Sequence, residues 1–520
     1  MKSPLEHIVI VGGGTAGWLT AAILAAEHSI DPETSAFRIT LIESPDISTI
    51  GVGEGTWPSM RTSLKRIGIS ETDFFRQCNA SFKQGTQFYN WIQQRDAGYA
   101  HPFTLPQSFA DANLARPWQQ AQRLVPFAEA VCPQLPLFER HLAPKQISTP
   151  EYACHLNYGY HLDAAKFADM LRVHAVEKLG VTHLSARVEY INSHKNGDIA
   201  SLATTEGEIA GDLFVDCSGA RSLLLGEHLG IPISHKQHIL FNDSALAAQV
   251  PYATANADIA SCTLSTAQDA GWIWDIGLPT RRGTGYVYSS AHISEERAQQ
   301  NLRQYVAASA GKAIAERLET KKIHYTPGHR EKFWHKNCVA IGMSAGFIEP
   351  LEASALVLVE VAATAIADHL PANRTHMEHV AKRFNDNFIY RWESIIDFLK
   401  LHYVLSQRRD SDYWQDHANA ASIPQSLGAR LEHWRYQSPW HDDDLHANEM
   451  FPSASYQYVL YGMGFEIQPS HTQRRSNANT QRIAADCFAQ NQQRSHQLLA
   501  MLPSNRELID KIHQHGMQTI

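Results

Sequence analysis

The sequence has few cysteines, no long apolar run and no excess of positive charge. Its seven cysteines are scattered over 520 residues, with no pair at the spacing of a metal site and no disulfide framework. A formal net charge of -8 argues against a nucleic-acid binder, which needs a basic face. No apolar run approaches a membrane span, and the first residues lack the apolar segment of a signal peptide. We therefore expect a reduced, cytoplasmic protein that contacts neither membrane nor nucleic acid.

The rest of the composition is that of an ordinary globular enzyme. Hydrophobic residues make up 44% of the chain and charged residues 19%, and 520 residues can bury one large core or two to three interlocked ones. The 28 histidines are dispersed. His441 and His446 flank the acidic run Asp442–Asp444, which we interpret as a solvated turn, with metal binding there as the alternative. We expect no metal.

The first pattern with chemical content is a glycine turn near the N-terminus. Residues 8–11 form a β-branched run typical of a strand buried on both faces. Gly12, Gly14 and Gly17 then fit G-x-G-x-x-G, and residues 19–26 continue as an apolar helix. The first glycine allows a tight turn, the second lets the backbone approach a pyrophosphate, and the third lets helix pack on strand. Thr15 and Ala16 lie between them, at the helix N-terminus that would face the phosphates.

A second strand and an acid strengthen the dinucleotide interpretation. Residues 38–42 form the strand, and Glu43 follows it, where an acid suits the hydroxyls of a ribose. The glycines alone could be an ordinary turn, but the order of strand, glycines, helix, strand and acid favours a dinucleotide site. Two later strand-and-turn segments, residues 212–220 and 338–346, favour FAD over NAD, because FAD domains of this type are discontinuous in sequence.

Other candidate residues are ambiguous when read alone. Lys83 lies in a strand-like alternation over residues 80–88, where the simplest interpretation is a solvated surface charge. Glu352 precedes an apolar helical segment and could simply cap it, and Glu349 is its neighbour. Trp272 and Trp274 project from one face of a predicted strand and could be core residues.

Taken together, these segments resemble the flavin-dependent halogenases of the tryptophan halogenase family, and the resemblance runs through most of the chain. The matching segments are residues 51–56, the Lys83 strand, residues 271–276 and residues 346–354. Two departures stand out. Gly277 replaces the proline of the family's W-x-W-x-I-P, and Ala353-Ser354-Ala355 follows Glu352 in place of Ser-Thr-Gly.

The resemblance implies how the reaction runs. In the family, FADH2, oxygen and halide give hypohalous acid, which Lys83 would hold and polarise or carry as a haloamine. Glu352 would orient the acid and take the ring proton from the arene. Backbone N–H groups of Ser354 and Ala355 would bind the halide. Trp272 and Trp274 would keep the substrate from the flavin, which blocks hydroxylation.

The resemblance also implies binding residues. Gly53 and Glu54 belong to a glycine-rich strap over the flavin, Gly346 and Phe347 lie near it, and His101 and Phe103 would sandwich an indole. Residues 448–464 give no confident match to the groups that clamp the amino and carboxyl groups of tryptophan. We therefore expect indole or a similar arene as substrate and bromide or chloride as halide. We expect a separate NAD(P)H-dependent flavin reductase as partner, and a homodimer is compatible with the sequence.

The expected fold is α/β, with an FAD-binding Rossmann-like part of the flavin monooxygenase kind. We expect residues 1–370 to hold this discontinuous part (about 1–60, 150–230 and 325–370) and a sheet-rich substrate part (about 61–149 and 231–324). Residues 371–520 should be mainly helical and complete the substrate site. The alternatives are an FAD-dependent aromatic hydroxylase and a non-catalytic flavin-binding protein.

Overall fold

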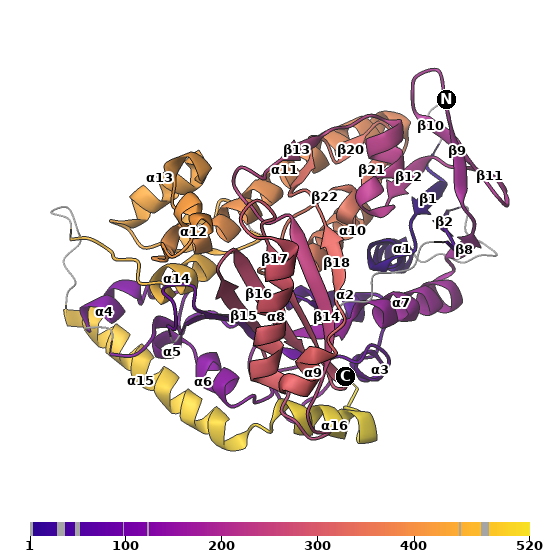
Figure 1. Ribbon diagram of the computed structural model, residues 1–520. Helices are drawn as coiled ribbons and strands as arrows, with labels where there is room; N and C mark the ends of the chain where they lie inside the picture. Colours follow the sequence, from indigo (N-terminus) through magenta and orange to yellow (C-terminus); the bar gives the residue numbers. More distant parts are fainter. Residues whose placement is uncertain are drawn as a thin grey trace. The chain divides into compact units, whose positions relative to one another are not determined.

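The computed structural model describes residues 4–28, 37–46, 53–96, 98–121, 124–446, 449–469 and 478–519 (Figure 1). The chain forms two compact units. Unit 1 comprises Met1–Ala80, Leu162–Gln237 and Tyr325–Trp392, and unit 2 comprises Ser81–His161, His238–His324 and Glu393–Ile520. The stretches of unit 1 reach further along the chain than the expected flavin segments, because α3 (Glu71–Gln77) packs on α7 (Ala164–Leu179) in this unit.

A mostly parallel sheet forms the centre of unit 1. Its six strands lie in the order β20 (Trp334–His335), β21 (Cys338–Ala340), β12 (Leu213–Asp216), β1 (His7–Val11), β2 (Arg38–Glu43) and β8 (Thr182–Ser185). All neighbouring pairs are parallel except β20 with β21. Every residue of β1 is buried, as its β-branched run predicts. This sheet confirms the Rossmann-like fold.

Helices cover this sheet. α1 (Thr15–His28) begins directly after the glycine turn and packs against α7 and α10 (Ser354–Asp368). α7 is capped at its start by Asp163, whose carboxylate accepts from the N–H groups of Ala165 and Lys166, and it ends at Gly180 in the left-handed conformation. The remaining elements of unit 1 are β3 (Gly53–Gly55), α2 (Ser59–Arg66), the β-sheet of β9 (Val188–Ser193), β10 (Ile199–Thr204) and β11 (Gly207–Ala210), and the small sheet of β13 (Ile233–His235), β19 (Gly328–Arg330) and β22 (Gly346–Phe347).

A seven-stranded sheet forms the centre of unit 2. The strand order is β18 (Lys321–His324), β14 (Ser244–Pro251), β17 (Arg281–Tyr288), β16 (Gly271–Gly277), β15 (Thr263–Gln268), β5 (Gly85–Tyr89) and β6 (Tyr99–Pro102). α8 (Glu295–Ala310) and α9 (Lys312–Glu316) follow in sequence, and α8 packs on β14 and β17 (Figure 1). Ile273 belongs to the core cluster with Leu302 and Val306 of α8, so its strand neighbours Trp272 and Trp274 face the other way.

The predicted strand over residues 80–88 is divided in two. β4 (Ser81–Lys83) pairs with Gly159–His161 at the start of β7 (Gly159–Asp163), whereas β5 begins at Gly85 and joins the large sheet. Gly85 has φ +155°, and a Cβ there would lie 2.3 Å from the His101 carbonyl oxygen. The alternation alone did not show this change of sheet.

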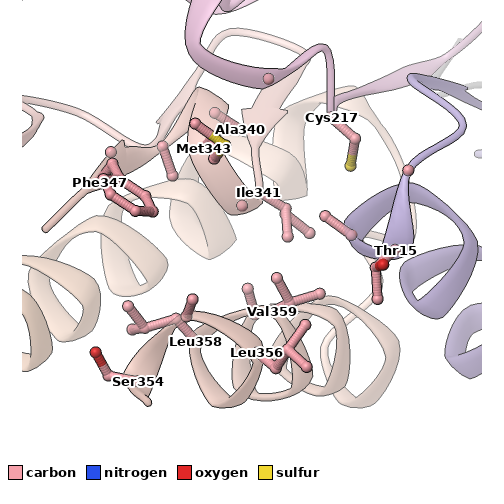
Figure 2. Close-up of a pocket in the computed structure, with 18 of the residues that line it drawn as sticks. Thr15, Cys217, Ala340, Ile341, Met343, Phe347, Ser354, Leu356, Leu358 and Val359 are labelled. Carbon is pink, nitrogen blue, oxygen red and sulfur yellow. The ribbon is translucent and has the colours of Figure 1, made fainter. Parts of the chain in front are cut away.

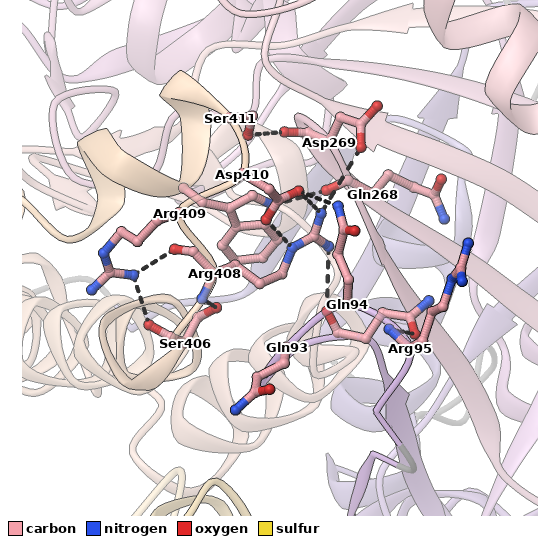
Figure 3. Close-up of polar contacts among 12 residues, drawn as sticks. Gln93, Gln94, Arg95, Gln268, Asp269, Ser406, Arg408, Arg409, Asp410 and Ser411 are labelled. Carbon is pink, nitrogen blue, oxygen red and sulfur yellow. Dashed lines mark hydrogen bonds and ion pairs between the residues drawn. The ribbon is translucent and has the colours of Figure 1, made fainter.

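The long helix α11 (Arg374–Leu405) continues from unit 1 into unit 2 at residues 392–393. In unit 2 its end is fixed by Arg408, whose guanidinium bonds both Asp410 carboxylate oxygens at 2.9 and 2.6 Å and lies 4.7 Å from the Trp414 ring centroid (Figure 3). Gln94 also donates to Asp410, which attaches this segment to the turn after β5.

The other helices of unit 2 are short or lie late in the chain: α4 (Ala115–Gln120), α5 (Phe127–Val131), α6 (Gln134–Glu139), α12 (Asp412–His417), α13 (Gln425–Trp434), α14 (Ser453–Gly462), α15 (Ala478–Met501) and α16 (Asn505–His515). The Asn505 side chain at the start of α16 donates to the carbonyl oxygens of Phe82 and Ala260, both at 3.3 Å. Within the described parts of the chain, none of the helices combines the length and apolarity that crossing a membrane requires.

Candidate functional site

The glycine turn of unit 1 is built so that side chains are excluded. Gly12 has φ +121°, and a Cβ there would lie 2.1 Å from the Cys217 carbonyl oxygen. A Cβ on Gly17 would lie 1.9 Å from the Gly12 carbonyl oxygen, whereas one on Gly14 would meet none of the described atoms within 4 Å. The first and third glycines therefore permit close backbone packing, and Gly14 leaves open space where a dinucleotide can approach.

Glu43 lies beside this turn, at the end of β2. A Cβ on Gly13 would lie 2.1 Å from the Glu43 side chain, so the carboxylate packs directly on the turn. Its Oε2 is 3.1 Å from His183 Nε2 on β8. The acid stands where the motif predicts a ribose contact, with a histidine that the sequence pattern did not indicate.

A cavity of about 260 Å³ opens in unit 1 between α10 and the segment after β21 (Figure 2). Eight residues predicted for the flavin and the halide line this cavity: Gly14, Thr15, Ala16, Glu54, Gly346, Phe347, Ser354 and Ala355. Gly12, Gly17 and Glu43 shape the adjacent turn instead, and Gly53 precedes Glu54 in β3. The structure thus brings predicted residues from three distant parts of the sequence to one cavity.

Much of the cavity wall is apolar and was not predicted residue by residue. Figure 2 shows Leu358 and Val359 of α10 on one side and Ile341 and Met343 on the other. The unpredicted lining also includes Ala164, Cys217, Gly219, Ala340, Gly342, Ala345, Ile348, Leu356, Ala362, Phe388 and Trp392. The sequence pattern predicted strands at residues 212–220 and 338–346 but not which of their residues line a cavity. The apolar stripe of α10 has the same sequence pattern whether it packs against protein or against a ligand, so its lining residues were not predictable either.

Asp216, at the end of β12, holds the turns around the cavity. Its carboxylate accepts from the backbone N–H groups of Leu224 and Leu225 at 2.9 and 2.8 Å and from the Ser344 hydroxyl at 3.1 Å. It is fully buried. These hydrogen bonds join the segment after β12 to the segment after β21, and the Arg330 guanidinium interacts electrostatically with the same carboxylate.

The start of α10 lies at the cavity. Ala353 occupies the N-cap position with φ 55° and ψ 42°, and no side-chain cap bond is made from it in the described structure. Ser354 and Ala355 follow and line the cavity. Unpaired N–H groups and the positive end of the helix dipole attract an anion there. Glu352 is buried, with 3% exposure, and it directly precedes Ala353, the N-cap residue.

Glu54 is the carboxylic acid among the residues that line the cavity. Burial raises the pKa of its carboxyl to about 7. The group is therefore neutral below neutral pH and negative above it. An anion bound in the same cavity is affected by this charge.

Lys83 is buried in unit 2, with 1% exposure, which makes the solvated-charge interpretation wrong. Its Nζ lies 5.3 Å from the centroid of the Phe103 ring, within cation–π range. His161, on the paired strand β7, donates or accepts at 2.8 Å with the Thr263 hydroxyl. Burial and the charge of Lys83 lower the His161 pKa well below its usual value, so this histidine is neutral beside the lysine.

His101 and Phe103 have different surroundings. His101 is buried among aromatic rings, with centroids 5.6 Å from Phe398, 6.4 Å from Phe451 and 6.2 Å from Tyr458. Phe103 is half-buried and faces Lys83. Phe451 and Tyr458 come from the segment at 448–464 that the sequence alone could not align with a function.

Trp272 and Trp274 are buried on β16, with ring centroids 6.4 Å apart and an interplanar angle of 63°. A Cβ on Gly285, the cross-strand partner of Trp274, would lie 2.1 Å from its ring. This tight packing is compatible with a role of the two tryptophans in the core and with their predicted role of keeping the substrate from the flavin. Gly51 and Val52 of the strap and Asn448 lie outside the described residues.

Comparison with known proteins agrees with the resemblance seen in the motifs. The family model described as "Tryptophan halogenase" matches residues 7–480. The crystal structure of a tryptophan halogenase from Shewanella frigidimarina NCIMB 400 is 52% identical, covers 100% of each chain and superposes with a TM-score of 0.96. Tryptophan 6-halogenase SttH of Streptomyces toxytricini is 33% identical over 89% of this chain and 91% of its own. BrvH, a flavin-dependent halogenase from Brevundimonas sp. BAL3, is 30% identical over 98% and 99%, with a TM-score of 0.84.

Proposed function

The chain belongs to the tryptophan halogenase family and is a flavin-dependent halogenase of an aromatic substrate, and we propose that Lys83 and Glu352 carry its chemistry on a small electron-rich arene such as indole. The observation that carries this proposal is the buried ammonium of Lys83 over the half-buried Phe103 ring. A cation held beside an aromatic surface is suited to polarise an oxidant next to an arene.

FAD fits unit 1. The open space at Gly14, the start of α1 and the apolar cavity provide a place for phosphates and for a flat ring system. Gly14, Thr15, Ala16, Gly346 and Phe347 would hold it. Bound as FADH2, it supplies hypohalous acid from oxygen and halide. The family depends on a separate flavin reductase, and we propose an NAD(P)H-dependent one, since one glycine turn of this kind was found in the sequence.

Lys83 holds the oxidant in this proposal. Its ammonium hydrogen-bonds hypohalous acid and polarises the oxygen–halogen bond, so that halogen is transferred to the ring carbon and the hydroxide that leaves takes a proton from the ammonium to become water. Lys83 then regains a proton from solvent, and the ring proton accepted by Glu352 is released to solvent. A haloamine on Lys83 is the alternative carrier. Either route needs a compact amine, which explains why arginine would not substitute.

Glu352 accepts the ring proton. The halogenated cationic arene loses the proton from the carbon that received the halogen, and a carboxylate is the base that the site offers. Overall, the arene C–H and HOX become C–X and water. Burial of Glu352 within unit 1 keeps its orientation defined.

Halide binds at the start of α10. The N–H groups of Ser354 and Ala355 act whatever their side chains are, so the departure from the family's residues leaves this function intact. We propose that bromide is used at least as well as chloride, because it is less strongly hydrated and more easily oxidised.

Indole is proposed as substrate in preference to free tryptophan. His101 and Phe103 offer aromatic contacts, and the neighbouring Phe451 and Tyr458 extend this apolar environment. Tryptophan would in addition need buried partners for its ammonium and carboxylate, and a substrate without these groups is favoured where such partners are missing. The relatives named for tryptophan make that amino acid the main competing substrate. We further propose a cytoplasmic location and allow for a homodimer.

Competition assays test this function. The enzyme, a flavin reductase, FAD and NADH are incubated with equal indole and tryptophan, in chloride and bromide together, and products are resolved by mass spectrometry. We expect bromoindole as the main product and no NADH oxidation without the reductase. Efficient regioselective chlorination of tryptophan with little indole turnover would contradict the substrate and halide proposals.

A further inference from the structure

A tryptophan in unit 1 is bonded to the peptide of the proposed proton acceptor. Trp57 follows β3, the strand that contains Glu54, and is half-buried. Its indole Nε1 donates a hydrogen bond to the backbone carbonyl oxygen of Glu352 at 2.7 Å. This short bond joins the segment after the strap to the turn that begins α10.

That turn needs support from neighbouring segments. Ala353 adopts the left-handed conformation, with φ 55°, which is unfavourable for a residue with a Cβ. Its N–H bonds the Pro350 carbonyl oxygen at 3.1 Å, and an alanine at the N-cap has no side chain to fix the first turn. The Glu352 carbonyl belongs to the peptide that leads into Ala353, so the indole bond restrains the turn at its strained point.

Trp57 is itself held in place, because α2 runs beside α10 in the same direction. The hydroxyls of Ser59 and Ser63 donate to the two carboxyl oxygens of Glu360 at 3.1 and 2.5 Å. Further along both helices, Arg66 bonds Asp368 at 2.9 Å. Later residues of α2 thus contact later residues of α10, so the two helices are held side by side and Trp57 lies just before the start of α2. Burial raises the Glu360 pKa to about 7, which adds a neutral O–H donor to this contact at lower pH.

We propose that Trp57 is a positioning residue for halogenation, which acts by holding the Glu352 peptide. By fixing this carbonyl, the indole sets the direction in which the Glu352 carboxylate points. The inference rests on the proposed role of Glu352 and extends it to a residue outside the reacting groups.

The test is a double-mutant cycle with Trp57→Phe and Glu352→Gln, measured as kcat for indole halogenation. Trp57→Phe keeps the ring and removes the N–H, so we expect kcat about tenfold lower, the KM for indole within about twofold, and fewer halogenated products per flavin oxidised. In the Glu352→Gln background, the same change should cost less than about twofold, because the group that it positions no longer accepts the proton.

Trp440→Phe is the matched control. Trp440 is also half-buried and its Nε1 also donates at 2.7 Å to a backbone carbonyl, that of Phe109 in unit 2. It should leave kcat and the coupling ratio unchanged, and thermal unfolding checks that both phenylalanine variants are folded at the assay temperature.

The outcomes separate the two proposals. If Trp57→Phe keeps the wild-type kcat, or if its effect is fully additive with Glu352→Gln, the positioning role is wrong while the halogenase assignment stands. If Glu352→Gln itself halogenates at the wild-type rate, the proposed role of Glu352 fails and the positioning role with it.

Discussion

Unit 2 contains three buried lysines, Lys83, Lys145 and Lys400, and the surroundings of Lys83 and Lys400 differ in kind. Lys400 is fully buried, and its ammonium donates to the Ile239 carbonyl oxygen at 3.1 Å, His417 Nδ1 at 2.9 Å and the Ser422 hydroxyl at 2.9 Å. Lys83 is almost equally buried, but its ammonium lies over the half-buried ring of Phe103. Burial alone therefore does not identify a reactive lysine.

The partners of each lysine indicate its task. An ammonium has three donors, and those of Lys400 are committed to three fixed acceptors, with the Phe241 ring centroid 5.0 Å away. Burial and Lys400 lower the His417 pKa well below its usual value, so this ring stays neutral and accepts through Nδ1. Lys400 thus joins α11, α12 and the segment after them, whereas the ammonium of Lys83 lies over the ring of Phe103, the residue proposed to contact the arene.

Lys83→Ala should produce the largest effect on activity. We expect halogenation to fall on the order of a thousandfold while FADH2 oxidation continues, since the lysine acts after hypohalous acid has formed. Product mass spectrometry and oxygen consumption measure the two processes. Normal halogenation by this variant would remove the distinction between the two lysines.

Lys400→Met should lower the stability of the protein and leave its activity unchanged. Removing the ammonium leaves three buried acceptors without their donor, and we expect the free energy of unfolding to fall by about 3 kcal/mol. Denaturant unfolding measures this loss. The activity per folded molecule should stay near the wild-type value, and a selective loss of kcat in a stable protein would show that Lys400 has been misjudged.

The carboxylates of unit 1 extend the comparison to Glu352 and Glu360, each 3% exposed. Glu360 bonds two serine hydroxyls of α2, whereas Glu352 stands at the start of α10. Glu352→Gln should slow halogenation about a hundredfold without abolishing it, because an amide still orients the oxidant but cannot accept the proton. Single-turnover rates with indole check this, and an unchanged rate would exclude Glu352 as the proton acceptor.

The smallest expected effect is a pH dependence at Glu54. Because its pKa is raised to about 7, the carboxyl is neutral at pH 6 and negative at pH 8, where it repels an anion in the cavity. We expect the halide KM to rise about threefold over this range. Glu54→Gln should flatten the profile, and a profile that stays equally steep would assign the titration to another group.

The fold of unit 1 was largely predictable, because its signals are local. The run at 8–11, the glycines and the strand ending at Glu43 each determine structure within a few residues, and β1, α1 and β2 appear where expected. Thr15 followed from the glycine turn, whereas Phe347 was singled out by the family resemblance. Interactions between residues close in sequence were sufficient to predict β1, α1 and β2.

The environment of Lys83 was not predictable in the same way. Its burial depends on pairing with β7 and on Phe103, and the divided strand at Gln84 follows from a backbone contact at Gly85. Family resemblance singled out the residue, but alternation alone indicated solvent. Trp57 gave no signal at all, since a hydrogen bond to Glu352 spans 295 residues and leaves no periodic pattern.

The contact of Asn505 with the Phe82 carbonyl has a consequence for how the enzyme is made. The strand that carries Lys83 is completed by a residue near the end of the chain. A ribosome must therefore synthesise 423 further residues after Phe82 before this part of unit 2 can close, and the early segment has to wait without its final partner. Nascent chains stopped before α16 should lack the contact that holds β4, the strand of Lys83. Fusions placed after α16 will need a linker that leaves Asn505 free to dock.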